Sequence, residues 1–413
     1  MAFRFVHTAD LHLDSPLRSL ALRDPALQDL VGVATRNALT RIVDLCLAEQ
    51  VDALLIAGDL YDGDQVSMKT ARFLQQELQR LDAAGIRTFI IRGNHDALSR
   101  ITRELVFPPS VTVFGGKAAT TVIDGVLPMA IHGLSFTKPH APDSLLAQYP
   151  AAVPGAFNIG LMHSSLNGSA GHDVYAPCAV VDLHGAGYGY WALGHIHLRA
   201  VHQGQATVVM SGMPQGRDIG EAGEKSVTLV TINDAGAVTL DHRVLAPVRF
   251  DRVTVDVAAA SDWPGLVALL GQGLRDARRT ASEDHLVLRP RLTGTTPLAW
   301  RILRDMDLLR EEAVSVAEGL GSVWIDKVEN VTQGGQVALP DGLTTDLVAG
   351  LAQDPAILAA ADHAIDDLLK ALPKELRLLL GASATDTAAA RDDLMAQGVA
   401  EVLARLGPPD QAA

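Results

Sequence analysis

Short apolar runs, each long enough for one buried strand, recur along the first 245 residues and end in glycine or polar residues. These strand-like runs are FRFVHTA (3–9), ALLIAG (53–58), TFIIRG (88–93), VTVFG (111–115), MAIHGL (129–134), NIGLMH (158–163), YWALGH (190–195), TVVMSG (207–212) and KSVTLVTI (225–232). The last run continues through a turn at 233–236 into AVTLDHRVL, which is typical of a β-hairpin. The pattern predicts a strand-rich domain over residues 1–245.

Amphipathic stretches separate the early strands. One runs from about Thr35 to Glu49 with the apolar spacing of a helix and places Cys46 on its buried side. Another spans about 66–83, and Gly85 just beyond it is a typical helix-ending residue. Strands that alternate with helices are typical of an α/β domain in which helices cover a largely buried sheet.

The pattern changes twice after residue 245. Residues 246–338 read as strand, helix, strand, helix, strand, which predicts a small α+β unit with helices at 264–280 and 297–318. Residues 339–413 carry no strand pattern, and their apolar positions predict short helices broken by prolines, ending in an amphipathic helix over about 385–406. This tail has more apolar surface than a terminal appendage needs, so it either folds back on the α+β unit or docks a partner.

Composition bounds the class of protein. With 48% hydrophobic and 20% charged residues among 413, the chain is typical of a globular protein. It has no apolar run of the roughly 18 residues that a membrane span needs and no signal-peptide pattern, so we expect a cytoplasmic protein without membrane contact. Two cysteines do not suggest a disulfide framework. The net charge of −14 argues against a protein that holds nucleic acid through a basic surface alone.

Polar side chains follow five of the apolar runs, at the point where each strand is expected to end. They are Asp10 and His12, Asp59, Asn94 with His95, His163, and His195 with His197. Ligand sites in α/β sheets form at the carboxyl ends of strands, so these side chains are expected to meet there. If the strands continue that far, Asp10 and His12 share one face, as do His195 and His197.

This set of side chains is suited to metal ions. Two aspartates, an asparagine and four histidines, with no thiolate, fit a pair of divalent ions such as Mn²⁺ or Fe²⁺. Two such ions about 3.5–4 Å apart can stabilise both the attacking and the leaving oxygen of a phosphoryl displacement. A bridging ligand must offer two carboxylate oxygens, and Asp59 is placed for that role.

The ordered motifs DLH, GDLYD, GNHD, LMHSS and GHIH resemble those of the calcineurin-like metallophosphoesterase superfamily. The resemblance implies a β-sandwich flanked by helices, followed by the small α+β capping domain and the helical tail. It implies that Asp10, His12, Asp59 and His197 hold one ion, and that Asp59, Asn94, His163 and His195 hold the other. His95 matches the family's catalytic histidine, which stabilises the scissile phosphate or protonates the leaving oxygen.

Within the superfamily, the segments ADLHLDSP, GDLYD and SGMPQGRDIGEAGEKSVTLV resemble the DNA repair exonuclease branch of SbcD- and YhaO-type nuclease subunits. That branch implies two divalent ions, Mn²⁺ first and Fe²⁺ or Mg²⁺ as alternatives. It also implies DNA as substrate, an SMC-like coiled-coil ABC ATPase as partner and a homodimer. Protein phosphatases of the superfamily carry GDxVDRG and GNHE, whereas this chain has GDLYDGD and GNHD, so protein dephosphorylation is disfavoured.

Several polar residues near the motifs have two readings each. Asp96 is expected to orient His95 or to cap the next segment, and His132 is either a core histidine or a hydrogen-bond partner of a metal ligand. Arg217 is a candidate DNA contact or an ordinary surface arginine. The GEAGEKS segment is not a Walker loop, because Glu224 replaces the glycine before Lys225 and a strand follows.

Three functions therefore stand side by side. The first is a two-metal-dependent DNA exonuclease or endonuclease in double-strand-break repair. A phosphodiesterase or phosphatase for small nucleotides is the alternative enzyme, which the acidic net charge favours. A metal-free scaffold is the alternative of another class, and the intact ligand set at every motif argues against it.

Overall fold

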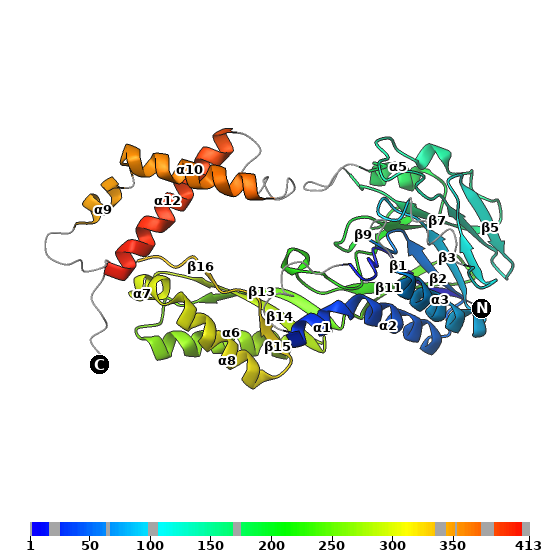
Figure 1. Ribbon diagram of the computed structural model, residues 1–413. Coiled ribbons are helices and arrows are strands. Elements are labelled where there is room, and N and C mark those ends of the chain that lie inside the picture. Colours follow the sequence, from blue (N-terminus) through cyan, green and yellow to red (C-terminus); the bar gives the residue numbers. More distant parts are fainter. Residues whose placement is uncertain are drawn as a thin grey trace. The chain divides into compact units, whose positions relative to one another are not determined.

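A computed structural model describes residues 2–15, 25–62, 67–97, 106–167, 175–334, 344–351, 353–372 and 384–406. The chain forms two compact units (Figure 1). The first comprises Met1–Arg252 with Thr280–Val287, and the second comprises Val253–Arg279 with Leu288–Ala413. The second unit thus joins most of the expected capping domain to the tail, and the division into three domains stays a prediction.

Two six-stranded sheets form the first unit. In order across the first sheet, the strands are β12 (Val238–Val244), β11 (Ser226–Ile232), β1 (Phe3–Thr8), β2 (Ala53–Ala57), β3 (Arg87–Ile91) and β4 (Val111–Val113). The second sheet contains β5 (Ala119–Ile123), β6 (Met129–Gly133), β7 (Phe157–His163), β8 (Tyr190–Gly194), β10 (Thr207–Met210) and β9 (Ala200–His202). The strands β1 to β4 run parallel, as do β6, β7, β8 and β10.

Helices cover the outer faces of both sheets, which makes a four-layered sandwich. Phe5 of β1 packs in the apolar layer between the two sheets, whereas its neighbour Val6 packs against α2 (Ala34–Ala48) and α3 (Met68–Ala83). Behind the second sheet, Trp191 of β8 packs with Leu183 of α5 (Val180–Gly185). The central strands are buried on both faces, which explains why their sequences are continuously apolar. The expected β-sandwich flanked by helices is confirmed.

The two helices predicted early in the chain are confirmed within two residues of their expected bounds. Ser67 caps α3 by accepting a hydrogen bond from the Thr70 N–H, and Gly85 just beyond the helix has a φ of +74°. Cys46 is buried on α2 as expected, and both Cys46 and Cys178 are free cysteines. A further helix, α1 (Pro25–Gly32), precedes α2. The strands β5 and β9 were not predicted, and β5 is a largely exposed edge strand without a buried pattern.

Residues 248–330 form a four-stranded sheet and three helices, most of which belong to the second unit. The strands are β13 (Val248–Asp256), β14 (His285–Thr293), β15 (Val323–Ile325) and β16 (Glu329–Asn330), and the first helix is α6 (Trp263–Thr280). The single helix predicted at 297–318 is wrong, because α7 (Ala299–Arg304) and α8 (Met306–Leu320) are separate helices. Asp305 interrupts them with φ −107° and ψ 32°, and its carboxylate accepts hydrogen bonds from Arg304 at 2.7 Å.

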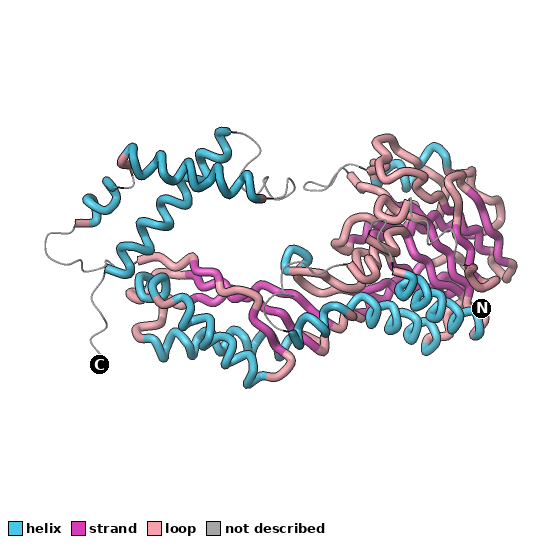
Figure 2. The backbone as a smooth tube through the Cα atoms, viewed as in Figure 1, coloured by secondary structure: helices cyan, strands magenta, loops and turns pink. Residues whose placement is uncertain are grey.

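The described part of the tail is helical, as predicted (Figure 2). Its helices are α9 (Thr345–Leu351), α10 (Pro355–Ala371) and α12 (Ala384–Leu406). Asp354 caps α10, and Pro355 occupies its first turn. The helix α12 contacts α7, α9 and α10, which agrees with a tail that folds back on the α+β unit. Large apolar side chains nevertheless stay exposed on the tail: Leu347, Leu351, Ile357, Leu368, Leu394 and Val402. Among the described helices, none is both long and apolar enough to cross a membrane.

Candidate metal centre

The predicted ligands lie in loops that follow β1, β2, β3 and β8, and at the end of β7. The loops after β1 and β2 pair with each other, because the Asp10 N–H donates to Gly58 O at 3.0 Å and the His12 N–H donates to Asp59 O at 3.1 Å. Asp10, His12 and Asp59 have φ values of 53°, 41° and 54°, in the left-handed region that costs non-glycine residues about 1 kcal/mol or more each.

The prediction that Asp10 and His12 converge because they share one face of a strand is therefore wrong. Strand β1 ends at Thr8 and β8 ends at Gly194. Neither the Asp10–His12 pair nor the His195–His197 pair therefore lies on a strand. The left-handed turns, and not the two-residue repeat of a strand, bring these side chains together. His195 likewise has a φ of 99°.

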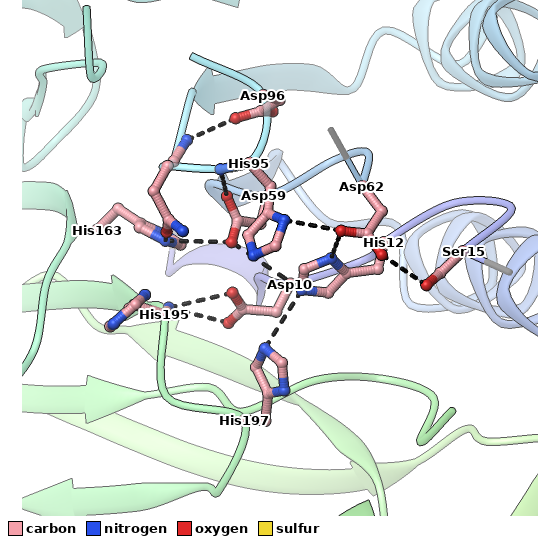
Figure 3. A network of polar contacts seen from close by, with 12 residues as sticks. Asp10, His12, Ser15, Asp59, Asp62, His95, Asp96, His163, His195 and His197 are labelled. Atoms are coloured by element: carbon pink, nitrogen blue, oxygen red, sulfur yellow. Dashed lines mark hydrogen bonds and ion pairs between the residues drawn. The ribbon is translucent and has the colours of Figure 1, made fainter. Parts of the chain in front are cut away.

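Asp10, His12 and His197 form the first group of ligand atoms, all within 4.8 Å of one another (Figure 3). The Nε2 atoms of His12 and His197 face each other at 3.2 Å, an arrangement that suits a cation between imidazole lone pairs. The Asp10 carboxylate accepts from the His195 N–H at 3.0 and 3.2 Å, which ties the loop after β8 to the loop after β1.

Asp59, His163 and His195 form the second group, again with their ligand atoms within 4.8 Å. His163 Nε2 lies 3.4 Å from Asp59 Oδ2 and 3.0 Å from Asn94 Oδ1, so the Asn94 side chain lies beside this second group. His163 Nδ1–H donates to Ala57 O at 2.9 Å, which leaves Nε2 facing the group. Burial lowers the pKa of His163, but Asp59 reverses this effect and raises the pKa to about 9.

Asp59 lies between the two groups. Its Oδ2 atom is 3.4 Å from His163 Nε2 and 4.0 Å from His12 Nε2, so one carboxylate faces both sets of ligands, as a bridging ligand must. Gly93 approaches this carboxylate so closely that a Cβ there would lie 2.2 Å from Asp59 Oδ1 and 2.7 Å from the His163 ring. Only glycine fits at this position.

The charges of the site fit cations. Asp10 is fully buried and Asp59 is 1% exposed, and within the described ranges neither carboxylate forms an ion pair with lysine or arginine. Burial raises the pKa of Asp10 to about 6. Two buried carboxylates without lysine or arginine beside them are costly unless further positive charge neutralises them. The residues present therefore fit two divalent ions bound by oxygen and nitrogen.

His95 lies beside this centre and is held by Asp62. His95 Nδ1–H donates to Asp62 Oδ1 at 2.7 Å, and this hydrogen bond raises the pKa of His95. The second oxygen of Asp62 accepts from the Ser15 hydroxyl at 2.8 Å. His12, Asp62 and His95 form a third group of atoms that lie within 4.8 Å. The sequence offered no pattern that assigned Asp62 to His95.

Asp96 and His132, two further candidates from the sequence, form hydrogen bonds with partners that were not expected. The Asp96 carboxylate accepts from the N–H groups of Leu60 at 3.1 Å and Gly93 at 2.7 Å, so it fastens the loops after β2 and β3 and does not orient the His95 ring. His132 bonds Thr120 and Asn158, both at 2.8 Å. Because these partners occupy both of its ring nitrogens, His132 is a core histidine and not a partner of a metal ligand.

Arg217 and Glu221 border the site from the segment after β10. Glu221 accepts from His197 Nδ1 at 2.8 Å and from Arg217 NH2 at 2.6 Å. Arg217 NH1 lies 3.5 Å from Asp62 Oδ2, so this arginine is part of the site and not an ordinary surface residue. Glu221 was not among the residues singled out from the sequence.

Comparison with known proteins finds two family models on this chain. Residues 3–199 match the calcineurin-like phosphoesterase model, and residues 250–333 match the model "Metallophosphoesterase YhaO, middle domain". The uncharacterized metallophosphoesterase YhaO of Bacillus subtilis is 29% identical over 397 residues, which cover 91% of this chain and 96% of that relative. The family models therefore cover the sandwich as far as β8 and most of the following α+β sheet.

More distant similarity covers between half and three fifths of the chain. The DNA double-strand break repair protein Mre11 of Sulfurisphaera tokodaii is 26% identical over 220 residues, 51% of this chain and 54% of that relative. A dimetal phosphatase structure from Danio rerio is 12% identical, with a TM-score of 0.36, over 59% of this chain and 96% of that chain. The chain therefore contains a calcineurin-like phosphoesterase domain over residues 3–199, followed by a YhaO middle domain over residues 250–333, and is a metal-dependent phosphodiesterase.

Proposed function

We propose that this metallophosphoesterase is a DNA nuclease that hydrolyses phosphodiester bonds with two divalent ions. The observation that carries the proposal is the position of Asp59 between two groups of buried ligands, with the Asp62–His95 pair beside them. The similarity to a relative named as a DNA double-strand break repair protein supports DNA as substrate. Under this proposal, the same centre can catalyse both exonuclease and endonuclease cleavage.

Two divalent ions, if held by these residues, would supply Lewis-acid stabilisation of the phosphate and would lower the pKa of the attacking water. The chain's own part begins with Asp10 and Asp59, whose carboxylates balance the charge of the ions. His95 is placed to act on the substrate, because Asp62 holds its Nδ1–H and 40% of its side chain is exposed. Its Nε2–H can then stabilise the phosphate or donate a proton to the leaving oxygen.

The ions are proposed to be Mn²⁺, with Fe²⁺ or Mg²⁺ as alternatives. Histidine nitrogens make up more than half of the proposed donor set, which suits Mn²⁺ or Fe²⁺ better than Mg²⁺ because Mg²⁺ prefers oxygen. Thiolates play no part, since Cys46 and Cys178 pack in apolar clusters. We place the protein in the cytoplasm, where it would also form a homodimer.

An SMC-like coiled-coil ATPase is the proposed partner. A net charge of −14 weakens the attraction of the nuclease to polyanionic DNA, and a basic partner would strengthen it. The exposed leucines of the tail helices, such as Leu368 on α10 and Leu394 on α12, are the proposed contact. Arg217 stays a candidate for a DNA phosphate contact, although its Nε and NH2 atoms bond Glu221 and its NH1 atom lies 3.5 Å from Asp62 Oδ2.

A second candidate is the hydrolysis of small nucleotide esters. The acidic net charge favours it, because a small substrate needs no extended basic surface. The two functions differ in the substrate and not in the centre. Turnover of a small diester without turnover of DNA, in the presence of the partner, would favour this candidate.

The purified protein should be assayed with Mn²⁺ on linear DNA, hairpin DNA and bis-p-nitrophenyl phosphate. We expect cleavage of all three, and no cleavage after chelation of metal. Asp59→Asn is the matched inactive variant: it keeps the size of the side chain but weakens the bridge, so hydrolysis should be abolished while the circular dichroism spectrum is unchanged. Activity of Asp59→Asn close to that of the natural protein would refute the two-metal assignment.

A further inference from the structure

The carboxylate of Glu221 joins a proposed metal ligand to an arginine. Glu221 ends the short 3₁₀ turn η2 (Ile219–Glu221), and its Oε1 atom lies 2.8 Å from His197 Nδ1 and 2.6 Å from Arg217 NH2. Its other oxygen accepts from the backbone N–H of Arg217 at 2.7 Å. The side chain is 13% exposed. With both oxygens bonded, Glu221 is held in one position.

This contact determines which nitrogen of His197 is available to a cation. A carboxylate only accepts hydrogen bonds, so the hydrogen of the neutral His197 ring resides on Nδ1 and the lone pair on Nε2. Nε2 is the atom that faces His12 Nε2 at 3.2 Å inside the first ligand group. Without Glu221, the hydrogen could move to Nε2 and the ring could turn away from the group.

Arg217 continues the line of contacts toward the proposed proton donor. Its NH1 atom lies 3.5 Å from Asp62 Oδ2, and the other oxygen of Asp62 bonds His95 at 2.7 Å. The Arg217 side chain is 21% exposed, so solvent screens these charges only in part. The contacts therefore run from His197 through Glu221, Arg217 and Asp62 to His95 without a gap longer than 3.5 Å.

We propose that Glu221 is a positioning residue that holds the His197 imidazole for metal binding, and that Arg217 connects this carboxylate to the Asp62–His95 pair. The inference rests on the proposed metal centre, but it concerns residues outside both ligand groups. A merely structural Glu221 would stabilise the turn that contains it and leave the metal affinity unchanged. Metal binding, measured apart from turnover, therefore distinguishes the two roles.

The test is calorimetric titration of the full-length, metal-free protein with Mn²⁺. The natural protein should bind two ions, and Glu221→Ala should bind one of them about 10- to 100-fold more weakly, the range known for partners that orient a ligand. Glu221→Gln keeps an oxygen that can accept the hydrogen bond from His197, so it should lose less Mn²⁺ affinity than Glu221→Ala. The control is Glu224→Gln, because Glu224 is an exposed carboxylate three positions along the chain that pairs with His242.

Unchanged affinity at both sites in Glu221→Ala and Glu221→Gln would overturn the positioning role, and so would an equal loss in Glu224→Gln. Thermal unfolding of each metal-free variant verifies that it folds. If Glu221→Ala does not fold, the near-isosteric Glu221→Gln takes its place in the test. Failure here is distinguishable from failure of the proposed function. If the natural protein binds two ions but cleaves no DNA, the nuclease is wrong and the role of Glu221 can still hold.

The link through Arg217 is tested by a double-mutant cycle on the same affinity. Arg217→Met removes the group that holds Glu221, so it should weaken the same ion as Glu221→Gln. Because the two residues act as one unit, the double variant should lose no more than about the larger of the two single losses. If the fold-loss of affinity in the double variant equals the product of the two single fold-losses, as for independent sites, Arg217 does not act through Glu221.

Discussion

His95 Nδ1 lies 2.7 Å from Asp62 Oδ1, and the His95 ring stands nearly perpendicular to that of His12, with the ring centres 5.0 Å apart. The carboxylate thus holds an accessible imidazole at the border of the candidate metal centre. A histidine in this position can act on a bound phosphate without being needed to hold either ion. This distinction between binding and chemistry is open to a direct test.

His95→Gln should keep both ions and lose most of the turnover. General acid catalysis contributes about 10²- to 10⁴-fold, so kcat on bis-p-nitrophenyl phosphate should fall by about that factor. The metal content is measured by elemental analysis of the Mn²⁺-loaded variant. Loss of an ion from His95→Gln would show that His95 is a ligand. Asp62→Asn, which leaves His95 in place with a weaker partner, should lose less turnover than His95→Gln.

Gly93→Ala should disrupt the centre although it adds one methyl group. The new Cβ would lie 2.2 Å from Asp59 Oδ1, so the bridging carboxylate must move. We expect Mn²⁺ affinity and turnover to fall by at least about tenfold each, since a displacement near 1 Å can cost about 10²-fold in rate. Gly115→Ala is the matched control, because nothing lies within 4 Å of a Cβ there. Equal behaviour of the two variants would contradict the close approach of Gly93 to Asp59.

Most of the fold could be predicted from the sequence, because its central strands are buried on both faces. Runs such as ALLIAG at β2 are apolar throughout, and this signal is strong. The half-exposed edge strand β5 lacks it. The break between α7 and α8 was missed because Asp305 changes only the local backbone and leaves the apolar spacing of the helix intact.

The residues that lie together in the candidate centre were also predictable from local motifs, whereas the residues that support them were not. Each proposed ligand lies at the end of a strand or just after it in a short motif, but Asp62 meets His95 from 33 positions away and Glu221 meets His197 from 24 positions away. No local spacing indicates which carboxylate faces which imidazole. The loop conformations were equally hidden, since nothing in the sequence specifies a positive φ at Asp10 or His12.

The metal-free protein should lose stability below pH 6.5 in part through His7. Burial lowers the pKa of His7 from 6.5 to about 3, so the folded protein keeps this ring neutral while the unfolded chain protonates it. The contribution is complete above pH 6.5 and falls by about 1.4 kcal/mol per pH unit as the pH drops toward 3. Urea unfolding in EDTA at pH 5 to 8 should show a shallower acid loss for His7→Gln. Parallel curves for the two proteins would exclude His7 as the source.

Substitutions on the tail should separate partner binding from hydrolysis. Leu368→Ser and Leu394→Ser alter side chains that are 47% and 49% exposed on α10 and α12, so the fold should tolerate them. Co-purification with the SMC-like ATPase should fall at least about tenfold, while hydrolysis of bis-p-nitrophenyl phosphate stays unchanged. Leu308→Ser, on α8 and also 47% exposed, is the control outside the tail. Full binding by both tail variants would exclude these leucines from the docking site.

The most direct test of the two-metal account is anomalous scattering from a crystal of the Mn²⁺-loaded protein. The account predicts two peaks about 3.5–4 Å apart, the spacing of two-metal sites, with Asp59 between them. One peak should lie among Asp10, His12 and His197, and the other among Asn94, His163 and His195. A single peak, or two peaks that do not share Asp59, would contradict it.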